Sequence, residues 1–145
     1  MVTVSEITTA DPEVLEALNH LLPQLSSSAQ PVSEDEFVEI VTSGATHLLI
    51  ARDDDGTVLG SMTLVTFRIP TGVRAWIEDV VVDGESRGRG VGESLNRAAI
   101  DLAYELGSRT IDLTSRPSRA AANLLYQKLG FVARDTNIYR HVPGA

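Results

Sequence analysis

Residues 80–93 read Val-Val-Val-Asp-Gly-Glu-Ser-Arg-Gly-Arg-Gly-Val-Gly-Glu, an apolar run followed by an arginine- and glycine-rich turn. The pattern predicts a strand that leads through the turn straight into a helix. Because glycine lacks a Cβ, Gly88, Gly90 and Gly92 allow positive φ and a close approach of a ligand to main-chain N–H groups. The first N–H groups of the helix have no partner within it and face the same place. The stretch therefore predicts an anion-binding site, to which its two arginines add positive charge.

The composition narrows the class of protein. With 145 residues, 43% of them hydrophobic, the chain predicts a single domain over residues 1–145 with its own core. It has no cysteine, which excludes disulfides, thiolate metal sites and a cysteine nucleophile. A formal net charge of −8 argues against nucleic acid as a partner. No signal peptide or membrane-spanning run is recognisable, so we expect a cytoplasmic protein without a membrane partner.

Periodicity predicts an alternation of strands and helices along the chain. Helix starts are marked by Asp11-Pro12 and by the capping box Ser33 to Glu36. Turn residues at 53–56 and 70–72 separate three strands and predict an antiparallel meander. The helix after the glycine turn acts as a crossover, which makes the next strand parallel to its neighbour. The expected strands are residues 2–7, 47–52, 58–67, 74–83, 110–113, 131–132 and 137–141, and the expected helices follow residues 11, 33, 90 and 118.

Two common phosphate-binding folds fit the glycine turn poorly. A P-loop requires a lysine directly after its last glycine, whereas Gly92 is followed by Glu93. In a dinucleotide-binding fold, Asp112 would be the ribose-binding acid about 20 residues after the glycines. Only 33 residues follow Asp112, too few to complete such a fold.

A second motif lies about 30 residues after the turn, where residues 123–131 read Asn-Leu-Leu-Tyr-Gln-Lys-Leu-Gly-Phe. Together with Arg87-x-x-Gly90-x-Gly92 after an apolar strand, it resembles the GNAT superfamily of acyl-CoA-dependent N-acyltransferases, over nearly the full chain. The resemblance implies an α/β (α+β) GNAT fold. Such a fold has a mixed, mostly antiparallel sheet of six to seven strands, flanked by about four helices in the order β-α-α-β-β-β-α-β-α-β-β.

The resemblance also implies acetyl-CoA as co-substrate. The turn would hold its pyrophosphate, and the apolar strand would offer main-chain groups to the pantetheine arm and one N–H to the thioester carbonyl, as acyl transfer requires. Arg116 and Arg119 are either contacts for the outer phosphates or solvated surface residues. The residues that the resemblance assigns to the cofactor are Val80, Val81, Val82, Arg87, Gly88, Arg89, Gly90, Val91, Gly92, Glu93, Asn123 and Tyr126.

Catalysis needs an acid for the leaving thiolate and a base for the amine. By resemblance, Tyr126 is the acid and Asn123 binds the pantetheine arm. Without the resemblance, Tyr126 would be interpreted as a core aromatic residue and Asn123 as a solvated amide. Residues 77–82 resemble the strand of amino-sugar acetyltransferases on which an acid meets the acceptor, so Glu78 is our first choice of base. Asp79 and a water chain are the alternatives. The three histidines show no metal-ligand spacing, and we expect no metal.

These patterns predict an N-acetyltransferase that moves an acetyl group directly from the thioester to a primary amine. The alternative is an acyl-CoA sensor or interaction domain without turnover. No motif identifies the acceptor, and small molecules and protein amines both stay open. The edge of the last expected strand, near Ile138, offers a route to a homodimer.

Overall fold

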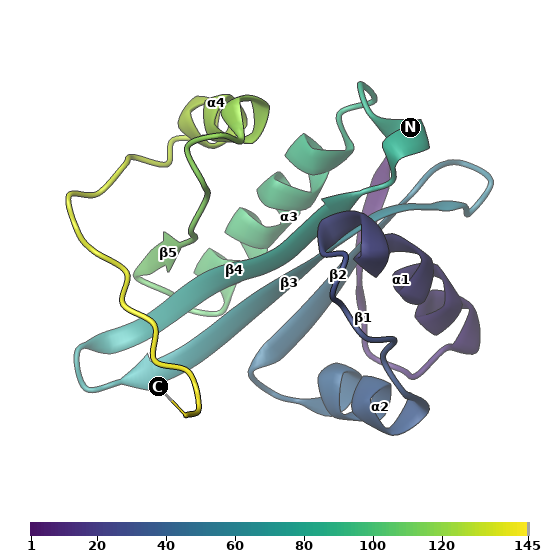
Figure 1. The fold of residues 1–145 in the computed structure, drawn as a ribbon, viewed down its shortest axis with the longest axis horizontal. Helices are drawn as coiled ribbons and strands as arrows, with labels where there is room; N and C mark the ends of the chain where they lie inside the picture. The colour runs from purple at the N-terminus through teal and green to yellow at the C-terminus, as the bar shows by residue number, and fades with distance from the viewer. Residues whose placement is uncertain (145) are drawn as a thin grey trace. The chain divides into compact units, whose positions relative to one another are not determined.

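The structure is a computed structural model that describes residues 1–144. The chain divides into two compact units, Met1–Thr114 and the segment from Ser115 onward, so the expected single domain stays a prediction. Its helices and strands, labelled in Figure 1, are β1 (Thr3–Ile7), α1 (Pro12–Leu25), α2 (Glu34–Thr42), β2 (Thr46–Arg52), β3 (Val58–Ile69), β4 (Gly72–Val82), α3 (Val91–Glu105), β5 (Thr110–Asp112) and α4 (Ala120–Lys128). A short 3-10 helix, η1 (Gly84–Ser86), lies between β4 and α3.

The first unit contains one sheet with the strand order β1-β2-β3-β4-β5. Its first three pairings are antiparallel, and β4 pairs with β5 in parallel. In the β2–β3 turn, Asp53 accepts N–H groups of Asp55 and Thr57 at 3.1 Å, and Gly56 has φ 88°. The predicted meander and the predicted parallel strand after the crossover helix are both confirmed.

Side chains at the helix starts explain where α1 and α2 begin. Asp11 accepts the Glu13 N–H at 2.9 Å, and Pro12 is the first residue of α1. At α2, the Glu36 N–H donates to Ser33 Oγ at 3.1 Å and the Ser33 N–H donates to Glu36 Oε1 at 2.9 Å. These bonds satisfy N–H groups that a helix leaves without a partner, and both predicted starts are confirmed.

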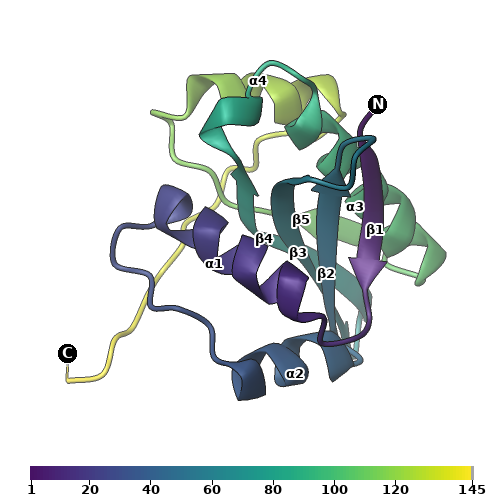
Figure 2. The ribbon, with the colours of Figure 1, turned by 90° about the vertical axis from the view of Figure 1, so that its right-hand side faces the viewer.

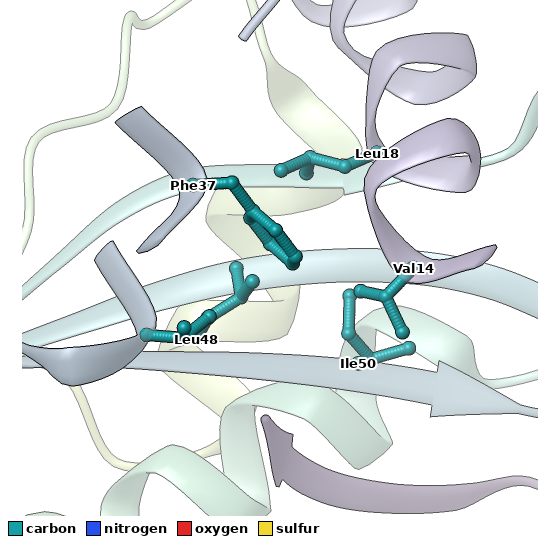
Figure 3. Packing of buried hydrophobic residues seen from close by; sticks show 6 residues of the cluster. Val14, Leu18, Phe37, Leu48 and Ile50 are labelled. Atoms are coloured by element: carbon teal, nitrogen blue, oxygen red, sulfur yellow. The ribbon is translucent and has the colours of Figure 1, made fainter. Parts of the chain in front are cut away.

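The two faces of the sheet are covered by different helices (Figure 2). Helices α1 and α2 lie on one face and α3 lies on the other. On the first face, Val14 and Leu18 of α1 pack with Phe37 of α2 and with Leu48 and Ile50 of β2 (Figure 3). Apolar residues at helical spacing give α1 one face that packs on the sheet.

Two expected strands at the C-terminal end are not observed. Residues 131–132 and 137–141 form no strand, so the sheet has five strands within residues 1–144 rather than six to seven. Val132, Ile138 and Tyr139 are 81%, 66% and 89% exposed. An apolar pattern becomes a strand only where a neighbour completes its hydrogen-bond ladder, and no described strand pairs with this segment.

Candidate functional site

β4 carries a bulge just before its apolar end. The pairing with β3 shifts between Glu78 and Val81, so that Asp79 and Val80 lie opposite the single residue Met62. Asp79 has φ 52°, in the left-handed region that aspartate tolerates better than most residues. Such a bulge bends the strand and increases its twist. The regular alternation of side chains along β4 is therefore interrupted here.

Beyond the bulge, one edge of β4 has no strand partner among residues 1–144. Residues 74–76 pair with residues 110–112 of β5, and β4 then continues alone on that side to Val82 (Figure 1). The side chain of Val81 is only 5% exposed, and Val80 and Val82 are half-buried. An unpaired strand edge offers main-chain N–H and C=O groups to an extended ligand. Val81 thus places its side chain in the core, and this part of β4 leaves a main-chain edge open.

The glycine turn leads from β4 into α3. Gly88 and Gly90 have φ 84° and 75°, so both use the freedom that the sequence predicted for them. Gly92 lies inside α3, which begins at Val91. Gly90 is the N-cap of α3 and supplies no side-chain cap, an arrangement that can bind an anion through main-chain N–H groups.

Contacts from α1 hold the beginning of this turn. The Gly84 N–H donates to Gln24 Oε1 at 2.9 Å, and His20 Nε2 lies 3.6 Å from Asp83 Oδ2. Asp83 also accepts the Glu85 N–H at 3.1 Å. Sequence reasoning missed Gln24 and His20, because the apolar period of α1 describes only the face that meets the core.

An acidic turn lies next to the arginines of the loop. Arg89 Nη1 is 3.8 Å from Asp53 Oδ2, and Asp53 belongs to the β2–β3 turn. Hydrogen bonds with Asp53 and Thr57, helped by the charge of Arg89, lower the pKa of Asp55 to about 2. The turn is therefore negatively charged at neutral pH, and the charge of Arg89 is partly neutralised by it. The sequence showed no sign of this pairing, since Arg89 and Asp53 are 36 positions apart in the chain.

Gly60 of β3 is a further residue that the sequence did not identify. A Cβ at this position would lie 2.8 Å from the Val81 carbonyl oxygen, 3.0 Å from Val91 Cγ1 and 3.3 Å from Leu95 Cδ1. Glycine therefore lets the first turn of α3 approach the sheet closely beside the open edge of β4. Its signal in the sequence, a lone glycine in a strand pattern, was overlooked.

The two candidate bases lie at the bulge and are both exposed. Glu78 Oε1 accepts a hydrogen bond of 2.9 Å from Trp76 Nε1. Partial burial of the carboxyl, and secondly the charge of Glu78, raises the pKa of Asp79. Glu78 pairs with Thr63, which pairs with Leu48, so it shares the sheet face that α1 and α2 cover.

The second unit carries the other two candidates on α4, three residues apart. Asn123 Nδ2 donates to the Arg116 carbonyl oxygen at 3.0 Å. Tyr126 is 8% exposed and meets the Phe131 ring edge-on, with centroids 5.8 Å apart. Burial raises the pKa of Tyr126, and the charge of Arg119 opposes this in part. The phenol is thus kept protonated at neutral pH.

The structure brings the open β4 edge, the glycine loop and the start of α3 together within the first unit. The second unit holds Asn123 and Tyr126 on one helix, and their alignment with the loop stays a prediction. Among residues 1–144, no three His, Cys, Asp or Glu side chains are grouped as metal ligands. None of the described helices combines the length and apolar character needed to cross a bilayer.

Comparison with known proteins places these features in a family. The family model described as "Acetyltransferase (GNAT) family" matches residues 14–131. Glucosamine 6-phosphate N-acetyltransferase 1 of Oryza sativa subsp. japonica is 32% identical in an alignment 127 residues long that covers 81% of this chain and 74% of that protein. A putative [ribosomal protein bS18]-alanine N-acetyltransferase of Bacillus subtilis is 30% identical over 118 residues, covering 80% and 75% of the two chains.

A solved structure shows that the fold is shared as well. AAC(6')-Iy, in complex with the bisubstrate analogue CoA-S-monomethyl-acetylneamine, superposes with a TM-score of 0.82 at 19% identity. The match covers 98% of each chain. At this identity the likeness concerns the fold alone.

Proposed function

This chain belongs to the acetyltransferase (GNAT) family, and on that premise we propose how its residues carry out N-acetyl transfer from acetyl-CoA to a primary amine. The family identity makes the chain an acetyl-CoA-dependent N-acetyltransferase. The observation that carries the proposal is the open edge of β4 beside an uncapped helix start. The roles below are assigned to individual residues on that geometry.

Cofactor binding would depend mainly on the backbone. The N–H groups around Gly88 and Gly90 and the start of α3 would bind the pyrophosphate, supported by the helix dipole. The pantetheine arm would extend along the open edge at residues 80–82, with Asn123 as a further contact. One N–H near the bulge would stabilise the developing oxyanion of the thioester.

The chemistry would be a direct displacement at the thioester carbonyl. The amine nitrogen forms the new C–N bond, the C–S bond breaks, and the amine proton passes to Glu78, directly or through water. Tyr126 gives its proton to the departing CoA thiolate. The ordinary pKa of an alkyl thiol is about 8.5. Burial raises the pKa of Tyr126, which makes the phenol a weaker acid than a thiol, so this role is proposed from the family resemblance and not from the shift.

An amino sugar is the acceptor class that we propose first. Glu78 lies on an exposed strand position that matches the amino-sugar acetyltransferase pattern, and a relative 32% identical to this chain is named for glucosamine 6-phosphate. Protein amines are the second class, because another relative is named for ribosomal protein alanine. Comparing the turnover of amino sugars with that of protein or peptide amines distinguishes the two acceptor classes.

Thiol release from acetyl-CoA across a panel of amines tests the proposal. The chain has no cysteine, so a chromogenic disulfide reports only the CoA thiol. We expect Tyr126→Phe to lower kcat by about 10²-fold or more with little change in the Kd for acetyl-CoA, since only the proton donor is lost. Tyr104→Phe is the matched control, because Tyr104 lies 56% exposed on α3.

An unchanged kcat in Tyr126→Phe would remove the acid role. Binding of acetyl-CoA without thiol release from any amine would instead favour the acyl-CoA sensor. Cytoplasmic location and the lack of nucleic-acid or membrane partners are carried here as further proposals; the acidic composition supports the lack of a nucleic-acid partner. A homodimer is also a proposal, but it does not rest on a strand edge near Ile138, because residues 137–141 form no strand.

A further inference from the structure

One face of β4 presents an acid, an aromatic ring and a cation in a row. Side chains two residues apart share a strand face, so Glu78, Trp76 and Arg74 all lie on the face that α1 and α2 cover. Trp76 Nε1 donates to Glu78 Oε1 at 2.9 Å, which joins the first two members. The row leads from the proposed base toward the β3–β4 turn.

Two arginines meet at that turn. Arg74 donates from Nη1 to Thr110 Oγ1 and from Nη2 to Thr71 Oγ1, both at 3.1 Å. Arg109 Nη1 donates to the Thr71 carbonyl oxygen at 3.0 Å. The stem of Arg109 fills the space of a side chain at Gly72, where a Cβ would lie 2.6 Å from Arg109 Cδ. Both guanidinium groups are therefore held in place beside Thr71.

The partners that hold these two arginines are neutral oxygens. Elsewhere in the described chain, Arg97 pairs with Glu93 and Arg89 pairs with Asp53, but no carboxylate among residues 1–144 lies within 4.0 Å of Arg74 or Arg109. Arg74 Nε is buried without a hydrogen-bond partner. A guanidinium has five N–H donors, and Arg74 uses two of them in hydrogen bonds to threonine hydroxyl groups. An ordered, uncompensated guanidinium of this kind suits a carboxylate or phosphate.

We propose that Arg74, supported by Arg109, binds an anionic group of the acceptor whose amine reacts at Glu78. This inference rests on the function proposed above. Four residues of strand separate the two ends, about 13 Å between Cα atoms. The acceptor is therefore an elongated amine that lies across Trp76, with its carboxylate or phosphate at the end far from the nitrogen. An amino-sugar phosphate has this chemistry, whereas an unmodified amino sugar lacks the anion.

Matched acceptor pairs test the inference. Thiol release is measured with glucosamine 6-phosphate against glucosamine, and with 6-aminohexanoate against hexylamine, so that phosphate and carboxylate are tested separately. We expect at least one anionic member to have a kcat/KM about tenfold or more above its neutral partner. Arg74→Gln keeps hydrogen-bonding capacity without charge. It should raise the KM of the anionic acceptor by about 10–100-fold, with the KM of the neutral partner and of acetyl-CoA within about twofold of wild type.

Arg68→Gln is the matched control. Arg68 is an exposed arginine near the same turn, but it pairs with Val73 and so lies on the opposite face of the sheet. It should change neither acceptor. Arg74→Lys should fall between wild type and Arg74→Gln, because it keeps the charge and loses the planar fork.

Several outcomes would overturn the inference. Equal losses with anionic and neutral acceptors would mean that Arg74 only holds the turn, and equal rates of both acceptors in wild type would mean that no anion is recognised. Titration of the CoA-bound protein with glucosamine 6-phosphate and 6-aminohexanoate gives a readout without turnover. Failure of both to bind contradicts the inference, whereas binding that Arg74→Gln abolishes supports it. No thiol release from any amine would contradict the proposed function instead.

Discussion

The two ends of β4 both offer positive charge to a ligand, but they do so by different means. At the end that leads into α3, the donors are main-chain N–H groups exposed by glycines with positive φ. At the end that begins at the β3–β4 turn, the donors are the side chains of Arg74 and Arg109, fixed by threonine oxygens. A site made of main-chain N–H groups tolerates most side-chain replacements but is disrupted when a Cβ is added to its glycines. A site made of arginine side chains is lost when those side chains are replaced.

The charges around the two ends differ as well. The main-chain site lies beside the acidic β2–β3 turn, where Asp53 pairs with Arg89. The arginine site has no carboxylate within 4.0 Å among residues 1–144. We infer that affinity for the cofactor is moderated by nearby acids, whereas the acceptor end keeps its full positive charge.

Of three substitutions in the glycine turn, the acidic turn and the β4 bulge, Gly90→Ala is expected to have the largest effect. At φ 75° an alanine costs about 1–2 kcal/mol, so either the fold loses that stability or the turn relaxes and binds the cofactor about 5–30-fold more weakly. Calorimetric titration with CoA and denaturant unfolding together measure both terms. Gly44→Ala is the control, because Gly44 has no positive φ and no atom within 4 Å of an added Cβ. Equal behaviour of the two variants would show that the backbone of the turn is not strained.

A smaller effect is expected for Asp53→Asn. The amide keeps the oxygen that accepts the N–H groups of Asp55 and Thr57 but releases Arg89 and removes a negative charge beside the loop. The KM for acetyl-CoA should fall by about two- to fourfold at low salt, and the gain should vanish at high salt. Asp54→Asn makes the same change of charge in the same turn without touching Arg89. If both variants gave the same gain, the ion pair itself would have no role.

The smallest effect concerns Asp79, between the two ends. Its folded pKa is raised, so the stability that it contributes is fully present below its unfolded pKa and is lost as pH rises through the folded pKa. Asp79→Asn removes this loss, and asparagine tolerates the left-handed backbone. The free energy of unfolding of the variant minus that of wild type, measured by urea unfolding, should be larger at about pH 7 than at about pH 3. A difference independent of pH would contradict the assigned cause.

Local features of the sequence predicted much of the fold. The starts of α1 and α2, the meander and the glycine turn each follow from a few adjacent residues whose backbone preferences and hydrogen bonds are short-range. The C-terminal segment shows the limit of this reasoning. Residues 137–141 have a strand-like composition, but a strand requires a partner, and sequence alone does not tell whether that partner is present.

The candidate site divides in the same manner. The residues of the loop could be predicted because glycine, arginine and a helix start lie together in the chain. Gln24, Asp53 and Gly60 could not, because each meets the loop or α3 from another element. The acceptor end could not be assigned from the sequence, because no motif identifies it.

The sequence by itself determined the anion-binding turn, the positions of the first two helices and the family to which the chain belongs, because these depend on backbone conformations that neighbouring residues impose. Three features could be read only from the tertiary structure. They are the position of the β4 bulge, the length over which β5 pairs with β4, and the oxygens that accept hydrogen bonds from Arg74 and Arg109. Those features depend on the register between strands, which is set by contacts between residues far apart in the chain.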